Sequence, residues 1–284
     1  QKASKYSGGI YHKTQIELTY NSNHIEGSRL THDQTRYTFE TNTIGVEKEV
    51  LNVDDVIETV NHFHCIDIII DSARAVLTEK FIKDLHFILK NGTSDSRKDW
   101  FAVGDYKKLP NEVGGMDTTI PEEVANKMKT LLMEYNAKDA KTFEDILDFH
   151  VKFERIHPFQ DGNGRIGRLW HTLLLSKWNP LFAWLPIESI IHDHQAEYYA
   201  AINQSNAQGE GTVFIEFMLG IIKEALTEAI NEQPVAQSKE EVRWMKIAAF
   251  LRTNHIIQNV DVQNLLNVSP ATASRVLNTL TKEG

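Results

Sequence analysis

The chain has 284 residues, enough for one large domain or two of ordinary size. Hydrophobic residues make up 41% and charged residues 24%, a globular composition that argues against a disordered or fibrous protein. The 30 Lys and Arg against 39 Asp and Glu give a net charge of −9, which excludes a uniformly basic nucleic-acid-binding coat. With Cys65 as the only cysteine and no apolar run near the ~18 residues of a membrane span, we expect a soluble cytoplasmic protein.

Most of the chain shows the apolar spacing of amphipathic helices, which predicts helices over residues 78–92, 121–135, 146–156, 166–179 and 214–232. Thr78 can cap the first of them, and Asn91-Gly92 ends it. Residues 100–115 are the exception, because Phe101 and Val103 alternate with small residues between glycine turns, which predicts a short β-hairpin or extended flap. The predicted fold class is therefore mainly α.

The charge is unevenly distributed along the chain. Residues 239–284 contain six basic and four acidic side chains, a charge of +2, which leaves 24 basic and 35 acidic residues, or −11, before them. The polar stretch 231–238 contains Pro234 and is typical of a linker. We therefore expect two domains, 1–230 and 239–284.

One polar segment between two predicted helices carries the chemistry: His157-Pro-Phe-Gln-Asp-Gly-Asn-Gly-Arg-Ile-Gly-Arg168. Pro158 ends the first helix, and Gly162 and Gly164 allow backbone conformations closed to other residues. The second helix then begins with unpaired N–H groups that bind anions. Arg165 and Arg168 share a helix face beside them, which predicts a polyphosphate site.

Two further residues of this segment suit catalysis on a phosphate ester. Asp161 can hold a divalent cation that bridges phosphate oxygens, and His157 is a candidate general base. Each residue alone has an ordinary explanation as a helix end or a turn. Their combination within twelve residues favours a site, and the lack of Gly-Lys-Ser/Thr after the glycines excludes a Walker-type loop.

His157–Arg168 matches, without departure, the His-x-Phe-x-Asp/Glu-Gly-Asn-Gly-Arg-x-x-Arg signature of the Fic family, which the chain resembles over roughly residues 10–230. The resemblance implies a helical bundle that transfers AMP from ATP to a protein hydroxyl. It implies that His157 deprotonates a target Ser, Thr or Tyr, and that Asp161 binds Mg²⁺, with Mn²⁺ as an alternative. The phosphates would be held by Gly162, Asn163, Gly164, Arg165 and Arg168.

Two other regions resemble parts of that family. The region Arg97–Val113, with Val103, Gly104 and Asp105 as the residues that would register a target, is similar to the Fic flap, which registers an extended target segment by strand addition. Tyr198, Tyr199 and Asn206 resemble residues that contact adenine. Read without the resemblance, the first is an ordinary surface hairpin, and two tyrosines at this spacing are core residues.

Ser22-x-x-x-Glu26-Gly27 is similar to the family's inhibitory motif, Ser/Thr-x-x-x-Glu-Gly/Asn. Without that resemblance, Glu26-Gly27 is a helix end. The resemblance implies that Glu26 pairs with Arg168, occupies the site of the γ-phosphate and repels ATP from its productive pose, which makes this chain self-inhibited. In some relatives the same glutamate positions the water that removes AMP.

The tail predicts a first helix with Val242 and Ile247, a short helix at 261–266, a turn at Asn267 and a helix that begins with Pro270. This order resembles a winged-helix-like helix-turn-helix without its wing. Thr272, Ser274 and Arg275 could face a DNA groove, whereas a protein-interaction or dimerisation module fits equally well.

Taken together, the sequence predicts a protein adenylyltransferase that is inhibited by its own Glu26, with Mg²⁺ as cofactor and with ATP and a protein target, including itself, as substrates. Two alternatives stay open: an enzyme that removes AMP or does both through Glu26, and a DNA-binding regulator with a nucleotide-sensing Fic fold. The sequence leaves undecided the target, the nucleotide preference, homodimer formation and DNA binding through 239–284.

Overall fold

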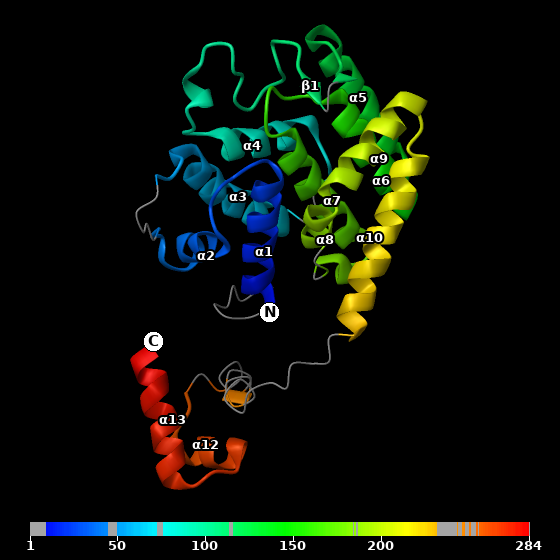
Figure 1. The fold of residues 1–284 in the computed structure, drawn as a ribbon. Helices are drawn as coiled ribbons and strands as arrows, with labels where there is room; N and C mark the ends of the chain where they lie inside the picture. The colour runs from blue at the N-terminus through cyan, green and yellow to red at the C-terminus, as the bar shows by residue number, and fades with distance from the viewer. Residues whose placement is uncertain are drawn as a thin grey trace. The chain divides into compact units, whose positions relative to one another are not determined.

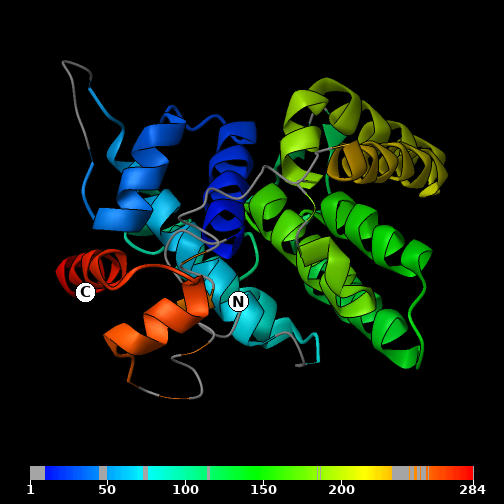
Figure 2. The same ribbon diagram turned by 90° about the horizontal axis from the view of Figure 1, so that it is seen from below.

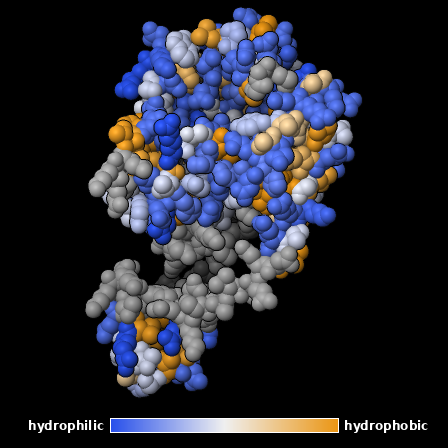
Figure 3. Space-filling model, in the orientation of Figure 1, coloured by the Kyte–Doolittle hydropathy of each residue, from blue (hydrophilic) through white to orange (hydrophobic). Residues whose placement is uncertain are grey.

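The computed structural model describes residues 10–44, 50–72, 76–113, 116–183, 185, 187–231, 243, 246, 247, 250, 254 and 256–283. The chain divides into two compact units, Gln1–Ala229 and Ile230–Gly284. Among the described residues, no helix is both long and apolar enough to cross a membrane. The face of the first unit seen in Figure 3 is largely hydrophilic, with small scattered hydrophobic areas.

The first unit is built of α-helices, which confirms the predicted fold class (Figure 1). They are α1 (Ile10–Ile25), α2 (His32–Thr41), α3 (Val53–Asp71), α4 (Glu79–Lys90), α5 (Pro121–Ala137), α6 (Phe143–Ile156), α7 (Asn163–Trp178), α8 (Ile187–Asp193), α9 (Gln195–Gln208) and α10 (Thr212–Asn231). Two 3-10 turns, η2 (Asp95–Arg97) and η3 (Pro180–Ala183), complete the helical elements described in this unit. The predicted cap of α4 is present, because Thr78 Oγ1 accepts a hydrogen bond from the Phe81 N–H.

The two described strands lie later than the sequence pattern places them. β1 (Glu112–Val113) pairs antiparallel with β2 (Met116–Asp117), and Glu112 stands opposite Asp117. Residues 101–111 have no strand structure, and Phe101 is buried against the helices instead. The predicted turn at 114–115 falls outside the described residues. The alternation at 101–103 therefore reflects burial of Phe101, and not a strand.

Helix α7 is the element around which the first unit is organised. It packs against α1, α3, α4 and α6, and α6 in turn packs against α5 and α9 (Figures 1 and 2). The side chains that α7 contributes to the core are Ile166, Leu169, Trp170, Leu173, Leu174 and Leu175. A capping box at Thr142 and Asp145 starts α6, whose apolar face meets α7. Helices from both sides therefore fix where α7 begins.

Burial in this core lowers the pKa of five histidines in the described part of the chain: to about 3 for His62 and His86, to about 4 for His157 and His171, and well below the ordinary value for His150. Unfolded histidines titrate near 6.5. Below that pH these histidines bind protons in the unfolded chain but not in the folded chain, and this difference favours unfolding. Burial also raises the pKa of Glu154, to about 8, and of Glu188, and these two groups oppose the effect.

Because the five histidines outnumber the two glutamates, the free energy of unfolding should decrease as the pH falls from about 6.5 to about 4.5. Calorimetry at constant ionic strength should show a Tm that decreases steadily over this range. A Tm that stays constant or rises would mean that these histidines are protonated in the folded chain.

The second unit contains the described helices α12 (Asn259–Leu266) and α13 (Pro270–Glu283), joined at Asn267, which has φ 52°. The Thr272 N–H donates to Ser269 Oγ and so caps α13. Most of the predicted helix around Val242 and Ile247 lies outside the described residues. The assignment of a winged helix-turn-helix stays a prediction.

Candidate active site

His157 lies at the junction between α6 and the loop that leads to α7. Its N–H donates to Phe153 O at 2.9 Å, the last hydrogen bond of α6, and its backbone is left-handed, with φ 50° and ψ 62°. A side chain in this region costs on the order of 1–3 kcal/mol, and such strain is concentrated at functional sites. Pro158 prevents α6 from continuing, so the ring is held at the helix end.

The loop from 158 to 162 is held by side chains from three directions. Asn163 closes it, because its Oδ1 accepts from the Phe159 N–H and its Nδ2 donates to Phe159 O, both at 2.8 Å. The fully buried Phe159 ring stacks on His86 with 4.0 Å between ring centroids. His86 Nε2 hydrogen-bonds to Asp161 O at 3.1 Å. The loop is therefore rigid before any ligand arrives.

Helix α7 begins after Gly162, whose φ of 84° requires glycine. At position 164 the lack of a side chain has a second effect: a Cβ there would overlap Glu26 Oε1. The Glu26 carboxylate therefore lies against the first turn of α7, at the positive end of its dipole. The predicted anion site and the predicted inhibitory residue are next to each other.

Arg168 is held by the end of α1. Its side chain is 2% exposed; Nη2 donates to Glu26 Oε1 at 2.7 Å and to Ser22 O at 2.9 Å, and Nε donates to Ser22 Oγ at 3.1 Å. Burial disfavours the charged guanidinium, but Glu26, Tyr198 and Tyr199 together outweigh it and raise the pKa of Arg168. Arg168 Nη1 is buried and finds no acceptor among the described residues. One donor of this arginine is thus available to a further oxygen.

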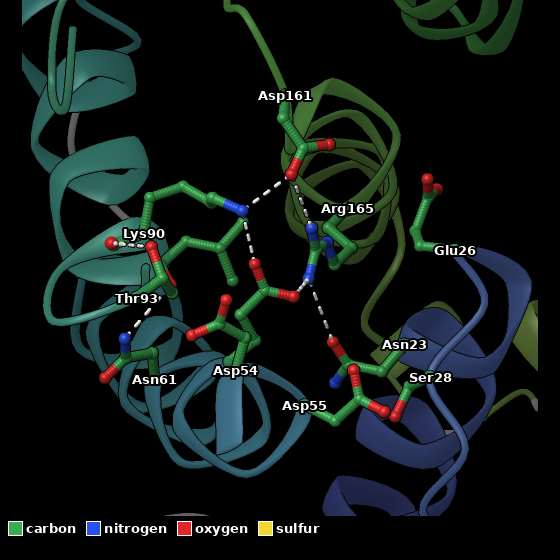
Figure 4. Close-up of polar contacts among 12 residues, drawn as sticks. Asn23, Glu26, Ser28, Asp54, Asp55, Asn61, Lys90, Thr93, Asp161 and Arg165 are labelled. Atoms are coloured by element: carbon green, nitrogen blue, oxygen red, sulfur yellow. Dashed lines mark hydrogen bonds and ion pairs between the residues drawn. The ribbon is translucent and has the colours of Figure 1, made fainter. Parts of the chain in front are cut away.

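A second ionic cluster surrounds Asp161. Lys90 Nζ of α4 donates to Asp161 Oδ2 at 2.6 Å, and Arg165 Nη2 lies 3.4 Å from the same oxygen (Figure 4). Glu58 of α3 contacts both Lys90 and Arg165, and Arg165 Nη1 lies 3.4 Å from Asn23 Oδ1. Three helices and the loop therefore meet through alternating charges.

The charges in this cluster balance. Burial acts to raise the pKa of Asp161, but Arg165 and Lys90 outweigh it and hold that pKa well below the usual range. Burial acts to lower the pKa of Lys90, but Asp161 and Glu58 raise it above its ordinary value. Both groups are therefore charged at neutral pH. Nearly half of the Asp161 side chain remains exposed, 46%, so its carboxylate can still reach a ligand.

Replacing Lys90 with Met should destabilise the chain by about 1–3 kcal/mol, because it removes the buried cation from Glu58 and Asp161 and leaves Arg165 to pair with both carboxylates. Urea unfolding followed by circular dichroism measures the loss. The matched control is Lys80→Met on the same helix, where the pair with Asp84 is exposed and the change should stay within about 0.5 kcal/mol. Equal losses in the two variants would show that the Lys90 cluster contributes no stability.

His157 has a strained backbone, and its side chain is enclosed by neighbouring residues. Burial, and then the nearby positive charge of Lys107, lower its pKa to about 4. The ring is therefore neutral at neutral pH and can accept a proton. Lys107 comes from the flap, where its N–H donates to Pro158 O at 2.9 Å.

The flap is attached to the loop by residues downstream of the three predicted to register a target. Besides Lys107, Asn111 Nδ2 donates to Phe159 O at 3.0 Å. Val103, Gly104 and Asp105 lie nearer α4: the Gly104 N–H donates to His86 Nδ1, and Asp105 pairs with Lys83, both at 2.9 Å. The structure thus places these three residues beside the site, and their role with a target stays a prediction.

The residues predicted to contact adenine lie on α9. Tyr198 is 1% exposed, and its hydroxyl hydrogen-bonds to His150 Nε2 at 2.9 Å, so its side chain is part of the core. Tyr199 and Asn206 are partly exposed. The ring of Tyr199 stands edge-on to Tyr198, 5.4 Å between centroids. A contact with adenine stays a prediction for these residues.

Sequence reasoning missed Glu58, Lys90 and Asn23. Lys90 is the last residue of α4, where a lysine ordinarily interacts with the helix dipole in water. Glu58 lies mid-helix, 107 positions before Arg165. Nothing local in the sequence marks either as buried. Asn23 directly follows Ser22 of the inhibitory motif, which was the one signal that could have found it.

The chain is similar to known proteins both in sequence and in fold. The model of the Fic/DOC family matches residues 76–175, a range that contains the whole segment 157–168. Protein adenylyltransferase Fic of Nematostella vectensis is 27% identical over 209 residues, 70% of this chain and 45% of that protein. Protein adenylyltransferase fic-1 of Caenorhabditis elegans is 25% identical over 213 residues, which are 72% of this chain and 39% of that protein. The chain spans less than half the length of these relatives.

Among solved structures, a Fic family protein from Desulfovibrio desulfuricans G20 superposes with a TM-score of 0.68 and 26% identity, covering 98% of this chain and 82% of that one. A Fic domain containing signaling protein from Bacteroides thetaiotaomicron VPI-5482 gives a TM-score of 0.59 and 26% identity, covering 78% of this chain and 88% of that one. The helical architecture around the site is thus one found in solved proteins.

Proposed function

Because this chain belongs to the Fic family, we propose that it transfers AMP from ATP to a hydroxyl group of a protein, and that Glu26 restrains this transfer. The observation that carries the proposal is the convergence of three features at the start of α7: a neutral His157, a glycine-flanked helix N-terminus and two buried arginines. Together they provide a base and a binding site for a polyphosphate.

The nucleotide phosphates would bind at the N-terminus of α7. Backbone N–H groups of Gly162, Asn163 and Gly164 and the positive helix end attract the α- and β-phosphates. Arg168 Nη1, buried without an acceptor among the described residues, would donate to the γ-phosphate, and Arg165 would stabilise the β-phosphate region. The Asn163 side chain is already used within the loop, so only its backbone serves the ligand.

The residues around Asp161 fit Mg²⁺. This ion is ordinarily held by one or two carboxylates together with substrate phosphates, and Asp161 offers one ionised, half-exposed carboxylate. In Figure 4 one oxygen of Asp161 faces Lys90 and Arg165 while the other points away from them. Among the described residues there is no cluster of three or more His, Cys, Asp or Glu for a metal. Bound there, Mg²⁺ would neutralise charge on the departing pyrophosphate.

His157 would act on the target. A Ser, Thr or Tyr hydroxyl gives its proton to the neutral imidazole, and its oxygen attacks the α-phosphorus in line with the departing pyrophosphate. The strained, enclosed position of the ring fixes it next to the phosphate site. Lys107 and Asn111 attach the flap beside it, which would hold the target segment in register.

Glu26 would inhibit by occupying the place of the γ-phosphate. Its carboxylate already accepts from Arg168 Nη2 and lies against the first turn of α7, so a phosphate there meets a like charge in a buried site. Ser22 adds two contacts from the same helix and increases the stability of this arrangement. ATP would then bind only in a pose that cannot react.

Hydrolytic removal of AMP, the second candidate function, is supported by one observation. The Glu26 side chain is 23% exposed, so its carboxylate can contact a water as well as Arg168. A carboxylate in this position can orient that water toward a phosphodiester and so release AMP from a modified protein. Incubating an AMP-modified target with the unaltered chain and with Glu26→Gly would show AMP release only in the first.

The proposed transfer is tested by mass spectrometry. The Glu26→Gly chain is incubated with ATP, Mg²⁺ and a cell lysate, and peptides are searched for Ser, Thr or Tyr residues that carry AMP. The same reaction with a Glu26→Gly/His157→Ala chain is the control. Adducts in the first sample that are missing from the second would support the proposal. Their absence from the first, or equal numbers in both, would refute it.

A further inference from the structure

One buried acid next to the candidate base has no part in the mechanism above. Glu154 lies on α6, one helical turn before His157, and is 7% exposed. Burial raises its pKa to about 8. A buried ionisable group of this kind costs stability unless a partner or a function compensates for it.

The geometry pairs this acid with His157. Glu154 Oε2 lies 3.8 Å from His157 Nδ1, too long for a hydrogen bond but within reach of a small side-chain rotation. Glu154 Oε1 and His157 Nδ1 are both buried, and neither has a side-chain hydrogen-bond partner among the described residues. The Glu154 carboxyl group therefore approaches Nδ1 through Oε2, while Oε1 lies against Gly167 of α7. The backbone of Glu154 also acts on the His157 ring, through a hydrogen bond that raises the pKa of His157.

Helix α7 leaves space for the acid. A Cβ at Gly167 would overlap Glu154 Oε1 and would lie 3.3 Å from the His150 ring. Gly167 is one of the two residues between Arg165 and Arg168 that the motif leaves variable. The glycine at this position therefore admits the Glu154 carboxyl group between α6 and α7.

We propose that Glu154 is a positioning residue for His157: it accepts a hydrogen bond from Nδ1–H, fixes the ring in the tautomer whose Nε2 is unprotonated, and stabilises the imidazolium formed during transfer. This inference rests on the proposed function. The hydrogen bond made by one ring nitrogen determines which nitrogen carries the proton. Without it, a proton on Nε2 would leave the ring unable to accept another there.

The step balances without an oxidant or reductant. The target O–H bond breaks, its proton moves to His157 Nε2, and the oxygen forms the new bond to the α-phosphorus. Pyrophosphate leaves with the electron pair of the broken P–O bond. The imidazolium then donates from Nδ1 to the ionised Glu154, a charge-assisted hydrogen bond that is stronger than one to the neutral acid.

Charged groups on every side act on this pair. Arg168 of α7 lowers the pKa of Glu154, and Glu26 raises it. Lys107 of the flap lowers the pKa of His157, whereas Glu26 and Asp161 raise it. Burial is the main cause of the raised pKa of Glu154 and Glu26 adds to it, so removing Glu26 lowers this pKa and favours the ionised form that the step requires.

The tautomer can be measured without any reaction. Nitrogen NMR of a ¹⁵N-histidine-labelled chain, with the His157 signals assigned from their loss in His157→Ala, should show Nδ1 protonated in the unaltered chain. Glu154→Gln keeps an acceptor and should preserve this tautomer. Glu154→Leu removes the carboxyl group and Gly167→Ala displaces it, while the backbone carbonyl of residue 154 stays in both. If the carboxyl group fixes the tautomer, both variants should shift the ring toward Nε2–H. An unchanged tautomer in these last two variants would overturn the inference.

Kinetics supply the second readout, in the Glu26→Gly background. The rate should rise with pH as Glu154 ionises, and the midpoint of this rise should lie below about pH 8 because Glu26 is gone. Glu154→Gln should abolish the rise and lower kcat by about 10- to 100-fold. Burial lowers the pKa of Lys107 to about 8 as well, but Lys107 is present in both variants. Identical pH profiles would overturn the inference. If no variant transfers AMP while the tautomer still follows Glu154, the proposed function fails and the pairing stands.

Discussion

Replacing Glu26 with Gly will raise the rate of AMP transfer by about 10- to 1000-fold, the increase expected when a competent state populated at roughly 0.1–10% becomes the main one. The variant removes the carboxylate that satisfies Arg168 and lies against α7, while Ser22 still holds the arginine in place. The rate is measured as incorporation of labelled AMP into the chain itself and into lysate proteins.

Glu17→Gln is the matched control for this variant. Glu17 lies on the same helix as Ser22, is partly exposed, and pairs with His32 at 3.0 Å, away from Arg168. Its loss should leave the rate unchanged. Ser22→Ala removes one contact to Arg168 and should give a smaller increase than Glu26→Gly. If all three variants transfer AMP at the rate of the unaltered chain, the ion pair with Arg168 is not inhibitory.

Replacing His157 with Ala in the Glu26→Gly background will lower the rate by roughly 10²- to 10⁴-fold, the usual contribution of a general base. Binding of ATP should persist, because the phosphates contact the start of α7 and the two arginines, and the imidazole is not needed to hold them. Transfer rate and ATP affinity must therefore be measured on the same preparation.

His64→Ala is the control for a histidine variant, since His64 is exposed on α3. It should change neither rate nor affinity. A His157→Ala chain that retains its transfer rate would remove His157 from the reaction. One that loses ATP affinity in parallel with its rate would show that the ring binds the nucleotide.

The sequence predicts the parts of this site that are local. His157–Arg168 lies within twelve residues, and helix periodicity and Pro158 place it between two helices, so the base and the phosphate-binding residues could be identified together. The contact between Glu26 and Arg168 joins residues 142 positions apart, and a motif resemblance alone made it predictable.

The parts that could not be predicted depend on packing. Lys90 reaches Glu58 and Asp161 only because α3, α4 and the loop meet, and Glu154 is buried only because Gly167 leaves space on α7. In the flap, isolated hydrogen bonds replace the expected strand: the Lys107 N–H and the Asn111 side chain reach the loop, while the strand pairing described joins 112–113 to 116–117. Hydrophobic alternation cannot signal a segment held by isolated hydrogen bonds.

The central claim is that this site transfers the AMP part of ATP. The most direct measurement incubates the Glu26→Gly chain and Mg²⁺ with ATP labelled either at the α-phosphate or at the γ-phosphate, and follows label on protein. We expect label from the α-phosphate alone, and its loss in Glu26→Gly/His157→Ala. Label from the γ-phosphate, or none from the α-phosphate, would contradict it.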